Sequence, residues 1–266
     1  MRERDVGNRR VTPARQYLDG RIKSLILDLT APHAGERLLD IGCGAGENLR
    51  LFHQKGCVVS GLDSSQSLLD ETRKKLENRV DLHLGEPADL PFSDNEFDLV
   101  TMIASLEYMK KPAEAIAEAI RVCRGRMFIG AMNPYSMIGI QGMLSNLFPF
   151  PPDASPSLRH FHIHSLSGMI RKCLPGVRIQ WGSVIFLPWG WYNFASSLEE
   201  QLPVIKNPFG AFIGLSFSVT FSFIAVQDVI RKPAVVNGQN PAHCVVSGTS
   251  GKDMPSYFDG RKKSES

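Results

Sequence analysis

A short strand that runs directly into three alternating glycines constrains this chain more than any other stretch. The strand is Leu38–Ile41, which is apolar except for Asp40, and Gly42, Gly44 and Gly46 follow it. Glycine lets the backbone turn sharply and lets a ligand approach without a Cβ in the way. The next residues begin a helix, whose free N–H groups point toward whatever lies over the turn. The stretch therefore predicts a buried parallel strand, a tight turn and a helix that together bind a ligand.

Apolar runs and helical patterns alternate along the chain after this turn. Further strands are expected at residues 57–63, 80–84, 97–103, 126–130, 177–187 and about 217–226. Segments with apolar residues at helical spacing separate most of these runs. Strands that alternate with helices in this way predict an α/β fold with a parallel, doubly wound sheet.

The composition divides the chain into three parts. Residues 1–36 are expected to form a polar arm and a covering helix, and residues 37–231 are expected to form one domain. Within that domain, the segment at about 134–164 is rich in Pro, Gly, Met and Phe, which favours a cap or lid. Gly, Ser, Pro, Asn and Lys dominate residues 232–266, so this tail is expected to be disordered.

Composition and charge exclude several classes of protein. The chain has 266 residues, of which 43% are hydrophobic and 21% are charged, as in ordinary globular proteins. A formal net charge of +3 is too small to indicate nucleic-acid binding. Five cysteines without a CxxC spacing predict reduced thiols rather than a disulfide framework or a zinc site. The charged N-terminus is not followed by an apolar segment, so we expect no secretory signal and a cytoplasmic protein.

One uncharged stretch, residues 207–227, is long enough to cross a bilayer. Within it, serine and threonine alternate with phenylalanine and valine from Ser216 to Phe223. A period of two is typical of a strand and not of a transmembrane helix. We therefore expect no membrane-spanning segment, while peripheral contact with a membrane stays open.

Two motifs carry a resemblance to a known family. The pattern D-x-G-x-G-x-G from Asp40 to Gly46 and the pattern G-x-x-x-D-L-P-F from Gly85 to Phe92 resemble motifs of the class I S-adenosylmethionine-dependent methyltransferases. The similarity is to the UbiE/UbiG-like, type 11 group that acts on small molecules, and it covers residues 37–133 as motifs. It implies a Rossmann-like sheet of seven strands, mostly parallel with the last antiparallel, and a cap inserted after the fifth strand.

The resemblance also implies a cofactor, S-adenosyl-L-methionine, which leaves as S-adenosyl-L-homocysteine. Asp40 would reach the methionine amino group directly or through water. Asp63, at the end of the second strand, would accept both ribose hydroxyls. Asp89 would accept from the adenine amine, and the N–H of Leu90 would face a ring nitrogen. The cofactor-binding residues implied in this way are Asp40, Gly42, Cys43, Gly44, Gly46, Asp63, Ser64, Asp89, Leu90 and Ile103.

The catalyst is much less well defined than the cofactor site. Methyl transfer from a sulfonium requires mainly orientation and exclusion of water, and it requires a base only when the acceptor is protonated. Candidates for such a base or for an acceptor contact are Glu107, Tyr108, His160 and His162. The histidines at 160, 162 and 164 would face one side of an extended segment, yet packing is favoured over a metal site, and no metal is expected.

Three functions stay open at this point. The Phe-, Met- and Trp-rich second half favours an enzyme that methylates a small, apolar acceptor. A catalytically silent protein of the same fold would keep the motifs but only bind a cofactor or a partner. An NAD-linked oxidoreductase would need glycine where the chain has Glu47, and it would have no need of the Asp-Leu-Pro loop at 89–91.

Overall fold

The computed structural model of the chain describes residues 13–77, 79–133, 135–136, 161–187, 191–192 and 196–219. The N-terminal arm, most of the predicted cap and the predicted tail lie outside these residues, so the proposed division of the chain stays a prediction. The four cysteines within the described ranges are free thiols. None of the helices described is both long enough and apolar enough to cross a membrane.

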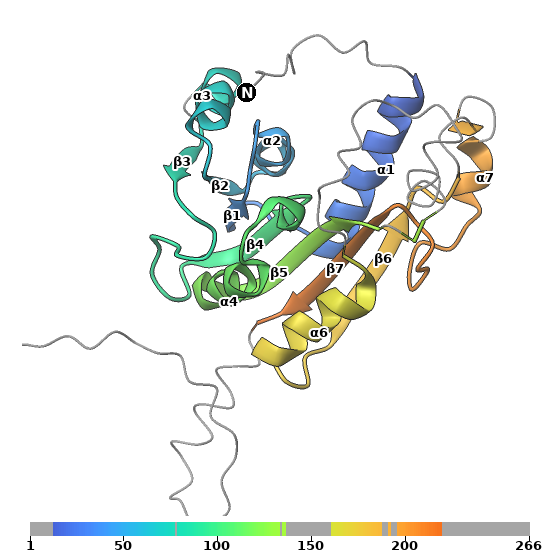
Figure 1. Ribbon diagram of the computed structural model, residues 1–266. Coiled ribbons are helices and arrows are strands. Elements are labelled where there is room, and N and C mark those ends of the chain that lie inside the picture. Colours follow the sequence, from blue (N-terminus) through green and yellow to red (C-terminus); the bar gives the residue numbers. More distant parts are fainter. Residues whose placement is uncertain are drawn as a thin grey trace, which may run out of the picture.

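Seven strands in the described part of the chain form one sheet (Figure 1). They are β1 (Arg37–Ile41), β2 (Val58–Asp63), β3 (Asp81–Leu84), β4 (Phe97–Ile103), β5 (Cys123–Met132), β6 (Ile179–Val184) and β7 (Phe212–Ser218). Their order across the sheet is β3-β2-β1-β4-β5-β7-β6. Neighbouring strands are parallel from β3 to β5, and β7 is antiparallel to both β5 and β6. The predicted α/β fold class, with seven strands and an antiparallel last strand, is confirmed.

Helices cover both faces of the sheet. They are α1 (Pro13–Thr30), α2 (Glu47–Gln54), α3 (Gln66–Leu76), α4 (Pro112–Val122), α6 (Ile163–Cys173), the short α7 (Ser196–Glu200) and the 3-10 turn η1 (Leu106–Tyr108). Apolar side chains of α1, α2 and α3 pack on one face, and those of α4 and α6 pack together on the other (Figure 1). Neighbouring strand residues alternate between the two cores, as Leu38 and Leu39 do. Burial on both faces explains the continuous apolar runs of the strands.

The last strand lies earlier in the chain than its pattern predicts. The alternation of serine and phenylalanine indicates a strand near 217–226, whereas β7 ends at Ser218 and residues from 220 onward lie outside the described part. Ser216 is buried, because its face of β7 is covered by α1, as the approach of Leu29 to the neighbouring Gly214 shows. The pattern therefore locates a strand without giving its bounds or its surroundings.

The topology brings four connections to one edge of the sheet. Because β1, β2, β3 and β4 are parallel, their carboxyl ends lie at the same edge. The strand order reverses at β1, with β2 and β3 on one side of it and β4 on the other. Ligands of open α/β sheets bind at such a point of reversal, outside the carboxyl ends of the strands.

Candidate functional site

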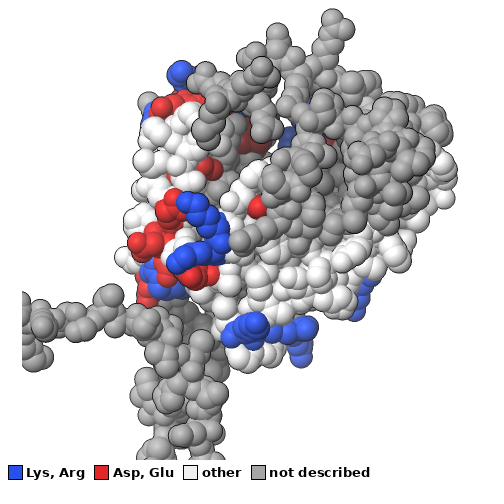
Figure 2. Space-filling view, in the orientation of Figure 1, with Lys and Arg blue, Asp and Glu red and all other residues white. Residues whose placement is uncertain are grey.

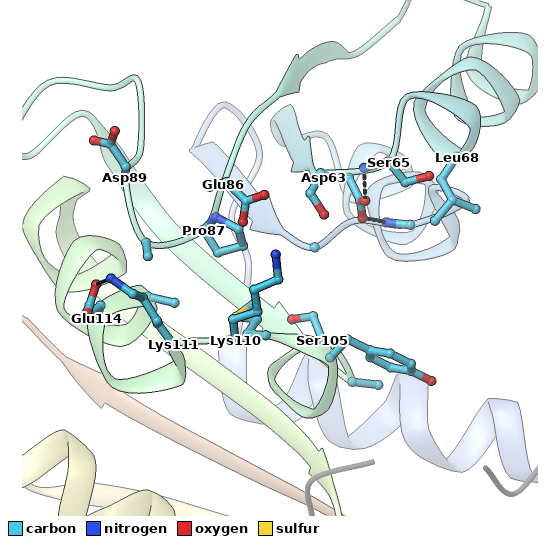
Figure 3. A pocket seen from close by; sticks show the side chains of 18 residues that line it. Asp63, Ser65, Leu68, Glu86, Pro87, Asp89, Ser105, Lys110, Lys111 and Glu114 are labelled. Atoms are coloured by element: carbon cyan, nitrogen blue, oxygen red, sulfur yellow. Dashed lines mark hydrogen bonds and ion pairs between the residues drawn. The ribbon is translucent and has the colours of Figure 1, made fainter. Parts of the chain in front are cut away.

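A cavity of about 730 Å³ opens at this edge of the sheet (Figure 3). Gly42 and Gly44, after β1, contribute to its wall, as do residues 63–65 at the end of β2 and residues 86–89 after β3. The remaining wall comes from the segment after β4, within residues 104–115. The volume is typical of a pocket for a small molecule or a cofactor.

The three glycines of the turn serve two different purposes. All have positive φ, of 77°, 53° and 80° for Gly42, Gly44 and Gly46, a region that favours glycine. A Cβ on Gly42 would lie 2.5 Å from the Cβ of Ser105. A Cβ on Gly46 would lie 2.5 Å from Cγ2 of Thr72. A Cβ on Gly44 would meet nothing within 4 Å, so Gly44 leaves room for a ligand in the cavity while the other two glycines permit close packing.

Asp63 connects the glycine turn to the end of β2. Its Oδ2 accepts a hydrogen bond of 2.9 Å from the N–H of Gly44, and its Oδ1 accepts one of 2.9 Å from the N–H of Ser65. Figure 3 shows both bonds at the cavity wall. Because each carboxylate oxygen has a further lone pair, Asp63 can also accept two hydroxyl donors from a ligand.

Asp40 lies behind the turn rather than in the cavity wall. Its side chain is fully buried, and its Oδ1 accepts a hydrogen bond of 2.7 Å from the Thr101 hydroxyl. Its Oδ2 has no hydrogen-bond partner among the described residues. Burial raises the pKa of Asp40 to about 7, although Thr101 and Asn48 favour the charged form. An incompletely paired carboxylate therefore underlies the turn, and its role toward the methionine amino group stays a prediction.

The other predicted cofactor residues fall into two groups. Ser64 and Asp89 line the cavity together with Asp63 and two of the glycines. Five predicted residues lie outside its wall and are buried: Asp40, Cys43, Gly46, Leu90 and Ile103. Burial raises the pKa of the Cys43 thiol, so this cysteine stays protonated and packs as a small apolar residue. The structure thus brings half of the predicted set together around one cavity.

The loop after β3 is held by α4 in a way that the resemblance does not imply. The N–H of Leu90 donates a hydrogen bond of 3.1 Å to Oε2 of Glu118. Arg121 donates to the carbonyls of Leu90, at 3.0 Å, and Phe92, at 2.8 Å. In this structure the N–H of Leu90 bonds to the protein, and the expectation that it faces a ring nitrogen stays a prediction. The sequence motifs do not include Glu118 and Arg121; their spacing of three indicates an ion pair on one helix but not its contact with this loop.

The sequence motifs also omit charged residues that line the cavity. These are Glu86, Lys110, Lys111 and Glu114. Lys111 and Glu114 form an ion pair of 2.9 Å, while the side chain of Lys110 points into the cavity on the side of Glu86 (Figure 3). Figure 2 shows acidic and basic side chains gathered together over α4, where this part of the wall begins. With the two aspartates already described, the wall carries four carboxylates and two ammonium groups, an excess that favours a cationic ligand.

The structure places the described catalytic candidates in different surroundings. Glu107 is buried in η1, and its Oε1 accepts a hydrogen bond of 2.8 Å from the backbone at the end of β5. Tyr108 is 72% exposed and lines the cavity. His162 precedes α6, with its ring centroid 5.7 Å from that of Tyr135, and His160 lies outside the described residues. Within the described ranges, no group of three or more His, Cys, Asp or Glu side chains is arranged to hold a metal ion.

Sequence comparison assigns the motif-bearing part of the chain. Residues 39–128 match a family model described as a methyltransferase domain. Over 116 residues the chain is 35% identical to the ubiquinone/menaquinone biosynthesis C-methyltransferase UbiE of Roseobacter denitrificans. This alignment covers 40% of this chain and 46% of that protein. Over 105 residues it is 33% identical to the 27-O-demethylrifamycin SV methyltransferase of Amycolatopsis mediterranei, with coverage of 36% and 39%. The chain thus spans about half or less of the length of such relatives.

Solved structures share the fold over most of the chain. A SAM-dependent methyltransferase of Thermotoga maritima, described as a possible histamine N-methyltransferase, aligns with a TM-score of 0.57 at 22% identity. The alignment covers 77% of this chain and 93% of that one. The [4+2]-cyclase SpnF aligns with a TM-score of 0.54 at 23% identity, with coverage of 74% and 80%. Because one of the two is a cyclase, the fold alone does not fix the reaction.

The comparisons support the resemblance: residues 39–128 match a methyltransferase domain, and the chain shares the fold of solved SAM-dependent methyltransferases. The matched segment 39–128 runs from within β1 into β5 and includes the carboxyl end of every strand that borders the cavity. Glu47, in the first turn of α2, occupies the position where a dinucleotide fingerprint has its third glycine.

Proposed function

We propose that this protein is an S-adenosylmethionine-dependent methyltransferase that methylates a small, apolar acceptor. The observation that carries the proposal is the cavity at the carboxyl edge of the sheet, where Asp63 meets the open face of Gly44. The relatives support the reaction class, since they include a C-methyltransferase of ubiquinone and menaquinone biosynthesis and a demethylrifamycin methyltransferase.

The residues of the cavity fit the chemistry of this cofactor. Asp63 would bind the two ribose hydroxyls with the lone pairs that its backbone hydrogen bonds leave free. Gly44 would let the cofactor pass close to the backbone, and Asp89 would accept from the adenine amine. The excess of carboxylates would favour the positively charged sulfonium. When bound, the cofactor supplies an electrophilic methyl group.

The protein's own residues would contribute orientation and exclusion of water. An acceptor would approach from the side of β5, where Tyr108, Met132 and Tyr135 are 72%, 42% and 63% exposed. Apolar and aromatic side chains of this kind suit an apolar acceptor. Tyr108 lines the cavity, so it would contact both reactants, and His162 beside Tyr135 is the candidate base for a protonated acceptor. Glu107 is the weaker candidate, because its carboxylate already binds the backbone of β5.

Calorimetric titration of the full chain tests the proposal at its cofactor. S-adenosylhomocysteine should bind in the micromolar range, and NADH should show no binding. Asp63→Ala should weaken the binding about a hundredfold or more, because hydrogen bonds to a charged acceptor contribute roughly 1.5–3 kcal/mol each. Asp81→Ala is the matched control, since Asp81 is an exposed aspartate at the start of β3, on the opposite edge of the sheet.

The outcomes separate the three functions that the sequence leaves open. Binding of NADH alone, or of neither ligand, would overturn the proposal. Binding of S-adenosylhomocysteine should be accompanied by transfer of a labelled methyl group from S-adenosylmethionine to members of a panel of apolar phenols and quinols. Cofactor binding without transfer to any of them would instead identify a catalytically silent protein of this fold.

A further inference from the structure

An exposed apolar loop lies between α7 and β7, beside the outer edge of β6 (Figure 1). We call residues 202–209 the docking loop. Within it, Ile205 and Phe209 are 69% and 67% exposed, and Leu202 is 36% exposed. Large apolar side chains exposed together on a folded protein mark an interaction site.

Hydrogen bonds to the sheet hold the docking loop in place. The carbonyl of Val204 accepts a hydrogen bond of 2.9 Å from the N–H of Ser183 in β6. At the other end of the loop, the side-chain amide of Asn133 donates to the carbonyls of Pro208, at 2.8 Å, and Gly210, at 3.0 Å. Because Asn133 directly follows β5, the end of the loop at Pro208 lies beside the carboxyl edge of the sheet. Ile205 lies farther along the outer edge of β6, where it pairs with Gly182.

The charge pattern of the docking loop is one-sided. Lys206 is exposed and lies between Ile205 and Phe209, with a positive φ of 59° that marks a bend in the chain. No acidic residue occurs from Gln201 through Gln227, a stretch that contains the uncharged run of the sequence. The exposed Glu200, at the end of α7, directly precedes this stretch. A cation flanked by large apolar side chains complements a surface that is both apolar and anionic.

We propose that the docking loop binds the protein to the surface of an anionic lipid bilayer. Ile205 and Phe209 would enter the boundary between headgroups and acyl chains, and Lys206 would lie at the level of the lipid phosphates. A protein partner matches less well, since hot spots between proteins are enriched in Trp, Tyr and Arg, which the docking loop lacks.

The position of the docking loop would bring a bound bilayer close to the side of the cavity from which an acceptor approaches. Through Asn133 the loop is joined to the end of β5, the side from which an acceptor would approach. An acceptor that partitions into the bilayer would then reach the cavity from the bound membrane. This consequence rests on the proposed function, whereas the lipid contact itself does not.

Cosedimentation of the full chain with lipid vesicles, without cofactor, tests the proposal. Vesicles of phosphatidylcholine with about one third phosphatidylglycerol should bind the protein, and those of phosphatidylcholine alone should bind it more weakly. The double variant I205S/F209S should bind the anionic vesicles at least about tenfold less, because two large apolar side chains no longer enter the lipid. Lys206→Ala should cost about fivefold, and only on the anionic vesicles. Val58→Ser is the matched control, since Val58 is 54% exposed at the opposite edge of the sheet.

The outcomes distinguish this proposal from its competitors. Unchanged melting temperature and unchanged S-adenosylhomocysteine affinity in the double variant would show that the fold is intact. Absence of vesicle binding by the wild type, or equal binding by the double variant, would overturn the proposal. A wild-type dimer that becomes monomeric in I205S/F209S would also overturn it, because a second copy would then cover the loop. Loss of cofactor binding with vesicle binding retained would refute the proposed function alone.

Discussion

The carboxyl edge of the sheet has two halves that are built in different ways. In the half after β1 and β2, the groups that meet follow strands directly: Asp63 ends β2 and binds the N–H of Gly44 in the turn after β1. In the half formed by β5, β6 and β7, the contacts come from loops and a short helix packed against the strands, as when Asn133 donates to the carbonyl of Gly210. Groups that directly follow strands leave a motif in the sequence, and contacts that depend on how loops pack do not.

Two buried carboxylates make this difference concrete. Glu199 on α7 is fully buried, and its oxygens accept hydrogen bonds from other groups. The donors are the N–H groups of Ile185, at 2.6 Å, and Phe186, at 2.9 Å, and the Tyr192 hydroxyl, at 2.9 Å. Asp40 is also fully buried, but its Oδ2 has no partner among the described residues. A satisfied buried carboxylate holds structure together, whereas Asp40 keeps one incompletely paired oxygen directly behind the glycine turn.

Removal of Glu199, the carboxylate with all three donors in place, should lower the free energy of unfolding more than any other change considered below. Glu199→Ala should lower the free energy of unfolding by about 5 kcal/mol, because three buried donors lose a charged acceptor. S-adenosylhomocysteine affinity should stay within about threefold of the wild type, since no ligand contact in the first half is removed. Urea unfolding and calorimetry measure the two quantities, and Glu200→Ala, at an exposed neighbour on the same helix, is the control.

An equal loss of stability and cofactor affinity in Glu199→Ala would refute the difference between the two halves of the carboxyl edge. It would mean that the two halves fold and bind as one unit, so the division at β5 would have no energetic meaning. Unchanged stability would refute the structural role that the three hydrogen bonds assign to this residue.

The next effect concerns the unsatisfied carboxylate and its dependence on pH. Burial raises the pKa of Asp40 from its ordinary 3.8 to about 7 in the folded protein. The unfolded chain therefore releases this proton at a lower pH than the folded chain does. The stability that Asp40 contributes is fully present below about pH 4 and is lost as the pH rises through about 7, by at most about 4 kcal/mol.

Asp40→Asn should remove this dependence. Between about pH 5 and pH 8, the free energy of unfolding of the variant should rise relative to that of the wild type, because the variant has no carboxyl to ionise. Urea unfolding at both values measures the change, with Asp81→Asn as an exposed control. A difference between variant and wild type that does not vary with pH would show that the carboxyl is not desolvated in the way its burial indicates.

The first half is predictable from the sequence because its ligand groups follow strands directly. A side chain at the carboxyl end of a parallel strand lies at the ligand-binding edge, so placing the end of β2 also places Asp63. Asp89 follows β3 in the same way. The N–H of Leu90 is different, since its partner Glu118 lies 28 residues later on α4. That contact depends on how a helix packs against a loop, and no local pattern encodes it.

The second half is predictable only in outline. Periodicity indicates the existence of β7, but its bounds depend on the strands that flank it, and the burial of Ser216 depends on α1, which covers that face. The partners of Glu199 lie 13 and 14 residues earlier, in the segment after β6. Likewise, the exposure of Ile205 and Phe209 follows from the path of the chain along β6. The sequence shows an uncharged run in this region, and only the fold shows which part of it is exposed.

The smallest expected effect separates packing from ligand binding within the first half. Gly42→Ala and Gly44→Ala both place a Cβ at positive φ, at a cost of about 1 kcal/mol. Gly42→Ala also sets that Cβ 2.5 Å from the Cβ of Ser105, so its free energy of unfolding should fall by about 3 kcal/mol in all.

Gly44→Ala meets no neighbour within 4 Å, so it should lose only the cost of its φ, about 1 kcal/mol. Its methyl group projects into the cavity, and S-adenosylhomocysteine should bind it about tenfold less tightly. Thermal melting and calorimetry on the two variants, which differ by one methyl group two residues apart, give both numbers. If Gly44→Ala lost as much stability as Gly42→Ala but kept its affinity, the whole turn would serve only to hold the structure together. In that respect it would resemble the part of the edge that β5, β6 and β7 form. The opposite result would locate the ligand at the glycine whose open side nothing in the described protein fills.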